Sequence, residues 1–581
     1  MKNNLVNVNY SVFMENPSTH FFEINIHFIE FNSTGGYIDL KLPVWRSGRY
    51  FIFDFASGVQ NFSALDKHNN ELNWYKTDKS TWRIHSGSSQ SFSVKYKIYA
   101  NEFEFRTRGL DENHAFINGS SLFMYADELR KLPVNLNVSP YNNWKISTGL
   151  EYINEIENIF YAPDYDTLID SPLEIGIQKD YELVVNGKKH ILSFHGKADY
   201  DINRLTEDFS LIIKKNYEFW GKVPYEKYVF IIHCSPTSGG GTEHINSTVV
   251  GVKPQAFSSV NGYKSFLRLI SHEFFHTWNV KQLKPAGLTP YNYSRENYTS
   301  ELWIAEGGTS YYDGLMLLRC GLLNEQDFFA EITKAVDDER RRPGYRVQSV
   351  AESSFDAWVK FWRRNPYAYF SESDYYSMGS YVCMALDLEI RNSSQNMYSL
   401  DDVFKTMFER FPLDVKGYTN DDFLNVCEEF SGISLKEFFD DHVYGTKAID
   451  WDKYLGFAGL KLSKIAKPGS PAAGLYPGKS GEKILVTSVL AGSPADRAGI
   501  IKGDEIIALD GMKLSFENME KKIRSLKAGD KAEFFVFRSN KLMKFPIILA
   551  EQNDESYSIE KIENPTGLQK AIYEKWTNAK W

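Results

Sequence analysis

HEFFH, at residues 272–276, is the segment of this chain that most constrains its fold. Apolar residues recur at helical spacing on both sides of it and predict a helix over residues 262–278. On such a helix His272 and His276 lie about one turn apart, so both imidazoles project from the same face. This spacing suits the chelation of a metal ion.

Glu273 follows the first histidine directly, at a position from which a carboxylate reaches a metal-bound water rather than the metal. HExxH alone leaves an alternative open, in which two buried histidines are held by hydrogen bonds. A catalytic zinc ion needs a third protein ligand. Glu306 is the candidate for this third ligand, because it lies in the apolar stretch LWIAEGGTSYY, where burying an unpaired carboxylate would be costly. The alternative is that Glu306 forms a structural ion pair.

With this third ligand the sequence resembles a gluzincin metallopeptidase, in which a second helix carries the glutamate ligand. The resemblance implies a mostly helical, thermolysin-like catalytic domain with one zinc ion held by His272, His276 and Glu306. GGTEH, at residues 240–244, is similar to the GGxEH segment of the glycyl aminopeptidase family. Glu243 would then bind the free amino group of a peptide, beside Gly240 and Gly241. An ordinary loop glutamate is the alternative.

YYSMG, at residues 375–379, is similar to the segment that supplies a transition-state tyrosine in related aminopeptidases. The resemblance assigns that catalytic role to Tyr376, with Tyr375 as a competitor and a core tyrosine as the alternative. Met378 departs from the family pattern, which often has lysine there. The helix carrying this segment is expected to begin with a capping box formed by Ser371 and Asp374.

The length of 581 residues predicts three to four domains. Short alternating apolar runs separated by turn residues predict an all-β, sandwich-like N-terminal domain over residues 1–172, followed by a hairpin turning at Asn186-Gly187. From about residue 201 to 450 the pattern is mostly helical, and residues 173–454 are assigned to the catalytic domain. The chain is therefore expected to be a multidomain α+β protein.

The segment ILVTSVLAGSPADRAGIIKGDEIIALDGMKL resembles a PDZ domain of the bacterial type and places this domain at residues 455–550. A peptide or protein ligand would add a strand to its groove. Gly459 and Leu460 are the candidates for the ligand-binding loop. Residues 551–581 form a tail with a helix expected around Tyr573 to Trp576.

Composition excludes several other classes. The chain is 43% hydrophobic and 24% charged, as in folded proteins, and its net charge of −9 without a basic run argues against nucleic acid as a partner. No segment approaches a membrane span, and the four cysteines are spaced as buried thiols. Because no export signal is visible, the cytoplasm is the default location; a removed leader would instead indicate the periplasm or secretion.

The order of the motifs resembles the glycyl aminopeptidase family over almost the whole chain. This resemblance implies release of small N-terminal residues, such as glycine or alanine, from peptides with a free N-terminus. Two alternatives stay open: a zinc hydrolase of the same fold acting on a non-peptide or endopeptidase substrate, and a PDZ-mediated interaction protein with a non-catalytic zinc domain.

Overall fold

The computed structural model describes residues 8–29, 35–87, 91–103, 106–465, 469–552 and 555–581. The chain forms two compact units, which are described separately below. The first contains residues 1–324 and 398–430, and the second contains residues 325–397 and 431–581. The expected boundaries at residues 172, 454 and 550 stay predictions. None of the described helices is long and apolar enough to cross a membrane.

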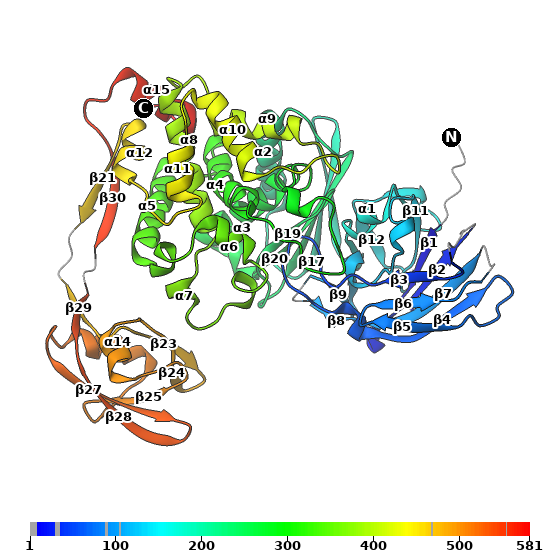
Figure 1. Ribbon diagram of the computed structural model, residues 1–581, viewed down its shortest axis with the longest axis horizontal. Helices are drawn as coiled ribbons and strands as arrows, with labels where there is room; N and C mark the ends of the chain where they lie inside the picture. Colours follow the sequence, from blue (N-terminus) through cyan, green and yellow to red (C-terminus); the bar gives the residue numbers. More distant parts are fainter. Residues whose placement is uncertain (1–7, 30–34, 88–90, 104–105, 466–468, 553–554) are drawn as a thin grey trace. The chain divides into compact units, whose positions relative to one another are not determined.

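The N-terminal part of the first unit is all β, as its alternating pattern predicts. Its largest sheet has inward apolar and outward polar residues in alternation; β2, for example, buries Phe22, Ile24, Ile26 and Phe28. The strands lie side by side in Figure 1. In spatial order they are β13 (Glu151–Asn154), β14 (Ile159–Ala162), β11 (Val134–Ser139), β1 (Val8–Phe13), β2 (Phe21–Phe28), β7 (Phe92–Tyr99) and β4 (Val59–Asp66).

Two smaller sheets and a short helix complete this region. The helix, α1 (Tyr165–Ile169), follows β14 of the large sheet in sequence. One sheet orders β12 (Lys145–Thr148), β15 (Leu173–Gly176), β10 (His114–Ile117), β9 (Arg108–Leu110) and β8 (Asn101–Glu102). The other orders β3 (Ile38–Lys41), β6 (Thr81–Ile84) and β5 (Trp74–Asp78).

The catalytic region begins with a mixed five-stranded sheet. Its order is β16 (Lys179–Val185), β17 (Lys188–Gly196), β18 (Lys227–Cys234), β20 (Ser247–Val252) and β19 (Gly241–Glu243). The hairpin at Asn186-Gly187 is confirmed, with both residues at positive φ. The region from residue 201 to 450 is mostly helical, as predicted, but it also contains β18, β20 and β19. The sequence did not reveal these strands, because a short run of buried apolar residues such as YVFII has no periodicity that separates strand from helix.

Helices follow this sheet in the first unit. They are α2 (Ile202–Trp220), α3 (Val260–Phe275), α4 (Thr309–Arg319), α9 (Leu400–Arg410) and α10 (Asn420–Ser431). The predicted helix around HEFFH is α3. The helix predicted around Glu306 is a π-helix, η8 (Trp303–Gly308), that continues into α4.

The second unit contains a helical part and the PDZ-like part. The helices are α5 (Glu325–Arg341), α6 (Val350–Phe355), α7 (Ala368–Ser371), α8 (Ser377–Ser393), α11 (Lys436–His442), α12 (Trp451–Phe457) and α15 (Gly567–Thr577). The expected C-terminal helix is α15, which buries Tyr573 and Trp576. The capping box expected at Ser371 and Asp374 was wrong: α7 ends at Ser371, and Asp374 instead accepts hydrogen bonds from the backbone of Tyr376 and Ser377 before α8.

The PDZ-like part has its own core, formed by residues such as Ile484, Ile506, Phe534 and Ile547. Its sheet orders β23 (Leu475–Ser480), β24 (Lys483–Val489), β25 (Glu505–Leu509), β27 (Lys531–Arg538) and β28 (Lys541–Ile548), with β26 (Met512–Lys513) paired to β25, and its helices are α13 (Pro494–Ala498) and α14 (Phe516–Arg524). Two short pairs, β21 (Leu460–Ile465) with β30 (Ser556–Lys561) and β22 (Ser470–Ala472) with β29 (Ala550–Gln552), flank it in sequence.

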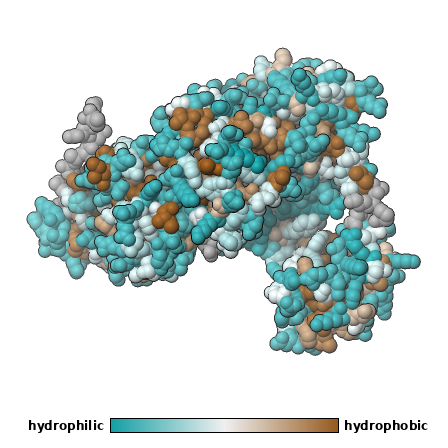
Figure 2. Space-filling view, turned by 180° about the vertical axis from the view of Figure 1, so that it is seen from behind, coloured by the Kyte–Doolittle hydropathy of each residue, from teal (hydrophilic) through white to brown (hydrophobic). Residues whose placement is uncertain are grey.

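The surface of the protein carries both hydrophilic and apolar side chains. On the face shown in Figure 2, hydrophilic side chains predominate and apolar residues are scattered among them.

Candidate metal centre and active site

The two histidines of HEFFH lie at the C-terminal end of α3. The helix begins where Ser259 Oγ accepts a hydrogen bond from the Gly262 amide, and it ends with His276 as its C-cap residue. The helical spacing brings the Nε2 atoms of His272 and His276 to 3.0 Å from one another. Both imidazoles therefore point to one place, as the sequence predicts.

Glu306 completes the cluster from the π-helix η8. Its Oε2 atom lies 3.1 Å from His276 Nε2 and 3.7 Å from His272 Nε2. A π-helix leaves carbonyl groups without the usual i+4 partner, and Asn279 compensates by donating to the carbonyls of Ile304 and Ala305, at 3.0 Å each. Asn279, three residues after His276, thus supports the wide turn that carries the glutamate.

The outer nitrogens of both imidazoles are held by acceptors. His272 Nδ1 donates to Asp313 Oδ2 at 3.2 Å, and His276 Nδ1 donates to the Asn279 carbonyl at 2.7 Å. Since each Nδ1 carries the hydrogen, the Nε2 lone pairs face one another, and a positive charge is required between them. Two imidazoles and one carboxylate form the His₂Glu donor set of catalytic zinc sites, so the three side chains fit zinc.

Electrostatics at this cluster favour positive charge. Although burial disfavours an imidazolium, Asp313 and Glu306 raise the pKa of His272 to about 10. Burial opposes ionisation of Glu306 as well, yet His276 and His272 lower its pKa to about 2. The negative field of these carboxylates also attracts a divalent cation.

Glu243 and Glu273 lie next to one another beside His276. One carboxylate oxygen of each and an imidazole nitrogen of His276 all lie within 4.8 Å of one another. Burial raises the pKa of Glu273 to about 7. His272 and His276 act to lower this pKa, whereas the negative charges of Glu243 and Glu306 act to raise it. A carboxyl group with this pKa can both accept and return a proton near neutral pH.

The glycines before Glu243 permit this close approach. A Cβ atom on Gly241 would lie 2.1 Å from Glu273 Oε1, and one on Gly240, which has a φ of +70°, would lie 2.9 Å from a terminal nitrogen of the Arg106 guanidinium. A third glycine, Gly48 of the N-terminal region, packs on the other carboxylate, because its Cβ would lie 2.6 Å from Glu243 Oε2. Because glycine has no side chain, the backbone at Gly241 and Gly48 can lie in direct contact with the carboxylates of Glu273 and Glu243.

A buried polar network fixes Gly48 and Glu243 relative to α3. Asp170 Oδ1 accepts hydrogen bonds of 3.0 Å from Ser47 Oγ, His244 Nδ1 and Lys281 Nζ. Burial would raise the pKa of Asp170, but Lys281 and His244 hold it well below its usual range. The network thus joins the residues next to Gly48 and Glu243 to the segment that follows HEFFH.

Comparison with known proteins identifies three regions of the chain. Residues 9–177 match the Peptidase M61 N-terminal domain, residues 265–382 match M61 glycyl aminopeptidase, and residues 456–549 match a PDZ domain. The N-terminal and catalytic regions are thus similar to those of the M61 glycyl aminopeptidase family. The match to M61 glycyl aminopeptidase includes His272, His276, Glu306 and Tyr376; it supports a metallopeptidase and suggests zinc as the metal.

Solved structures resemble the chain to different extents. An aminopeptidase N family protein from Idiomarina loihiensis is 28% identical, with a TM-score of 0.91, and the match covers 97% of this chain and 100% of that one. An M1 zinc metallopeptidase from Deinococcus radiodurans is 12% identical, with a TM-score of 0.49 over 76% of this chain and 94% of that one. No curated protein matches the chain.

Two groups of predicted site residues lie in the second unit. Tyr376 precedes α8 and stacks at 5.3 Å from Phe361, while the hydroxyl of Tyr375 accepts a hydrogen bond from Trp362 Nε1 at 3.1 Å. The roles of both tyrosines stay predictions. Met378 is buried in the first turn of α8.

The proposed PDZ loop residues have other surroundings. Leu460 is buried and begins β21, which pairs with β30 rather than with the PDZ-like sheet. Gly459 packs on the C-terminal aromatic ring, since its Cβ would lie 2.8 Å from the Trp581 side chain. Both residues thus take part in packing, and their role in a ligand-binding loop stays a prediction.

Sequence reasoning missed the residues that hold the site residues in place. Asn279, Asp313 and Asp170 have no spacing that points to the metal, because their contacts form only when distant segments pack. One signal was available, since polar residues inside apolar stretches need partners. Asp313 in SYYDGL and Asn279 in HTWNV both meet that description.

Proposed function

We propose that this protein is an aminopeptidase that holds one zinc ion with His272, His276 and Glu306. The observation that carries the proposal is the position of Glu243, whose carboxylate lies within 4.8 Å of Glu273 and of the metal-binding His276. A buried carboxylate this close to the metal ligands leaves little room for a peptide to extend past it. It therefore favours a substrate whose chain begins there.

Glu243 has the charge needed to recognise an N-terminus. It is 4% exposed and adjoins a second buried carboxylate, Glu273. An ammonium group between them would relieve their repulsion and form charge-assisted hydrogen bonds. An internal peptide bond offers an amide instead, which carries no compensating charge. This difference supports an exopeptidase rather than an endopeptidase.

Strand β19 offers the rest of the peptide a backbone partner. It is the last strand of its five-stranded sheet, paired on one side with β20, and it carries Gly241 and Glu243. An extended peptide binds such an edge by adding a strand. In this arrangement the main chain of the substrate is aligned by β19 while Glu243 fixes its first residue.

Glu273 performs the proton transfers. When bound, zinc acidifies a water molecule and polarises the scissile carbonyl group. Glu273, with its pKa near 7, accepts the proton from the attacking water and returns it to the nitrogen of the leaving amine. Proton transfer by a positioned side chain contributes about 10²- to 10⁴-fold to a rate. We propose that Tyr376 donates a hydrogen bond to the developing oxyanion.

The preference for glycine or alanine at the first position comes from the family resemblance and is part of the proposal. We further propose that the PDZ-like part accepts an extended peptide or protein segment. A non-catalytic scaffold would have no use for a Glu273 carboxylate within 4.8 Å of His276, and a hydrolase of non-peptide substrates would have no use for Glu243.

The test compares substrates with and without a free amine. Replacing Glu243→Gln should reduce kcat/KM for alanyl peptides by about 10- to 100-fold, the value of one hydrogen bond to a charged group, and should leave the slow turnover of N-acetylated peptides unchanged. The exposed Glu207→Gln on α2 is the matched control. Equal losses on both substrates would refute the role of Glu243.

A further inference from the structure

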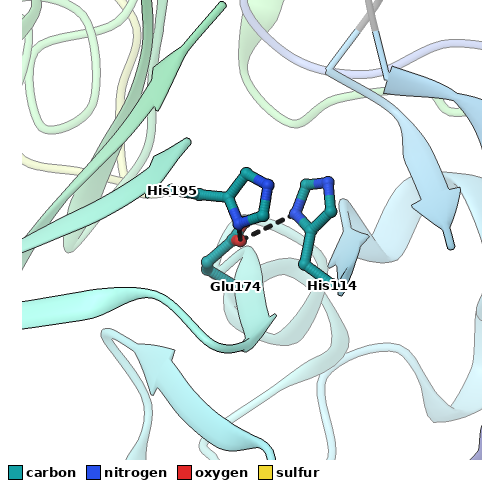
Figure 3. Close-up of side chains that lie close together, drawn as sticks. All are labelled: His114, Glu174 and His195. Carbon is teal, nitrogen blue, oxygen red and sulfur yellow. Dashed lines mark hydrogen bonds and ion pairs between the residues drawn. The ribbon is translucent and has the colours of Figure 1, made fainter. Parts of the chain in front are cut away.

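A second cluster of metal-binding side chains lies in the first unit, built by residues that the peptidase chemistry does not use. His114 on β10, Glu174 on β15 and His195 on β17 converge, with one ligand atom of each within 4.8 Å of the other two. Figure 3 shows both imidazoles beside the carboxylate. The cluster thus joins a sheet of the N-terminal region to the sheet of the catalytic region.

Both histidines direct the same atom at the same oxygen. His114 Nδ1 lies 2.8 Å from Glu174 Oε1, and His195 Nδ1 lies 3.6 Å from it. The second distance is too long for a hydrogen bond, and His195 Nδ1 is a buried atom without a hydrogen-bond partner. A buried nitrogen without a hydrogen-bond partner calls for an explanation, and a metal ion beside the carboxylate would provide one.

A fourth residue orients the carboxylate. His233 on β18, the strand paired with β17, lies with its Nε2 atom 2.8 Å from the other oxygen, Glu174 Oε2. This contact occupies Oε2 and leaves Oε1 toward His114 and His195. Metal-binding carboxylates are commonly held by such an outer hydrogen bond.

The buried carboxylate of Glu174 needs a positive charge beside it, which an imidazolium or a bound metal ion can supply. Glu174 is fully buried, and among the described residues its ion-pair partners are three histidines rather than lysine or arginine. The rings of His114 and His195 stack at 3.5 Å with an angle of 8°, a geometry in which two imidazolium ions would repel one another. Once the rings turn so that their in-plane lone pairs converge, a divalent ion bound to both Nδ1 atoms would satisfy the carboxylate without charging both rings.

One side of the cluster opens into a cavity of about 240 Å³. His114, His195 and His233 line it together with Cys234 and the loop of residues 235–239. There is space for water or a small ligand beside an ion. Two imidazoles and one carboxylate with open positions form a donor set used by mononuclear divalent transition metals.

We infer that His114, Glu174 and His195 form a second metal site, which takes a divalent transition-metal ion such as Zn²⁺. The ion ties β10 and β15 to β17 and stabilises the junction of the two sheets. The inference does not depend on the peptidase activity, because these three residues form a group separate from that of His272, His276 and Glu306.

The experiment counts metal ions in tag-free, full-length protein that has been loaded with Zn²⁺ and dialysed. Elemental analysis should give two zinc ions per chain for the wild type and for the control His68→Ala, an exposed histidine in a turn. His195→Ala should retain one, and a double variant lacking His272 and His276 should also retain one. One zinc in the wild type and none in the double variant would overturn the inference.

A second measurement separates the site from a general loss of structure. In the double variant, Co²⁺ should produce visible absorption from nitrogen and carboxylate ligation, and His195→Ala added to this background should abolish it. His195 suits this test because its side chain is 20% exposed, whereas Glu174 is fully buried. Thermal midpoints measured without metal verify that the variants fold. Unchanged Co²⁺ absorption in the triple variant would refute the assignment of His195.

Discussion

Gly241→Ala tests how closely β19 must approach the catalytic carboxylate. The added Cβ atom would lie 2.1 Å from Glu273 Oε1, 2.3 Å from its Cδ and 2.5 Å from its Cγ. Ordinary contact begins at about 3.4 Å, so the carboxyl group or the strand must move by about 1.3 Å. Gly241 does not have a positive φ, so its own backbone tolerates alanine.

A misplacement of 1 Å costs about 100-fold in rate, so kcat/KM of the variant should fall about 100-fold. The assay is hydrolysis of an alanyl anilide, with zinc content measured on the same sample. Gly239→Ala is the matched control, because nothing lies within 4 Å of its Cβ position two residues earlier. Full activity in Gly241→Ala, or equal losses in both variants, would refute this reasoning.

Three further predictions concern residues around the site. Asp313→Asn removes the carboxylate that holds His272 and should weaken zinc binding about 10- to 100-fold in a chelator competition. Gly48→Ala places a Cβ 2.6 Å from Glu243 Oε2 and should reduce kcat/KM for free peptides more than for N-acetylated ones; equal effects would contradict it. Asp170→Asn breaks a buried ion pair at a cost of about 3–5 kcal/mol. Because the pKa of Asp170 is lowered on folding, this stabilisation is present above the unfolded pKa of about 3.9 and is lost as pH falls below it. The difference in thermal midpoint between wild type and Asp170→Asn should therefore be constant near neutral pH and shrink below about pH 4.

The sequence predicted those parts of the site that depend on local spacing. His272 and His276 were predictable because a helix fixes the direction of residues four apart. Glu306 was predictable because an acidic residue in an apolar stretch needs a partner. The π-helix around Glu306 was not predictable, since it depends on Asn279 bonding to carbonyls more than 20 residues away in sequence.

For the fold as well, the features that depend on local sequence patterns were predictable and those that depend on tertiary packing were not. Alternating patterns revealed the N-terminal sheet and the Asn186-Gly187 hairpin. The buried strand β18 and the edge strand β19 were missed, because one is uniformly apolar and the other has only three residues. The contact of Gly48 with Glu243 joins positions 195 residues apart (243 − 48), and only tertiary packing creates it.

Product analysis of one peptide pair tests the central proposal most directly. The zinc-loaded protein is incubated with an unblocked alanyl pentapeptide and with its N-acetylated form, and the products are identified by mass spectrometry. If Glu243 binds the N-terminal ammonium beside His272, His276 and Glu306, free alanine and the remaining tetrapeptide appear first, a chelator abolishes the reaction, and the acetylated peptide persists. Internal cleavage of both peptides at similar rates would contradict the account.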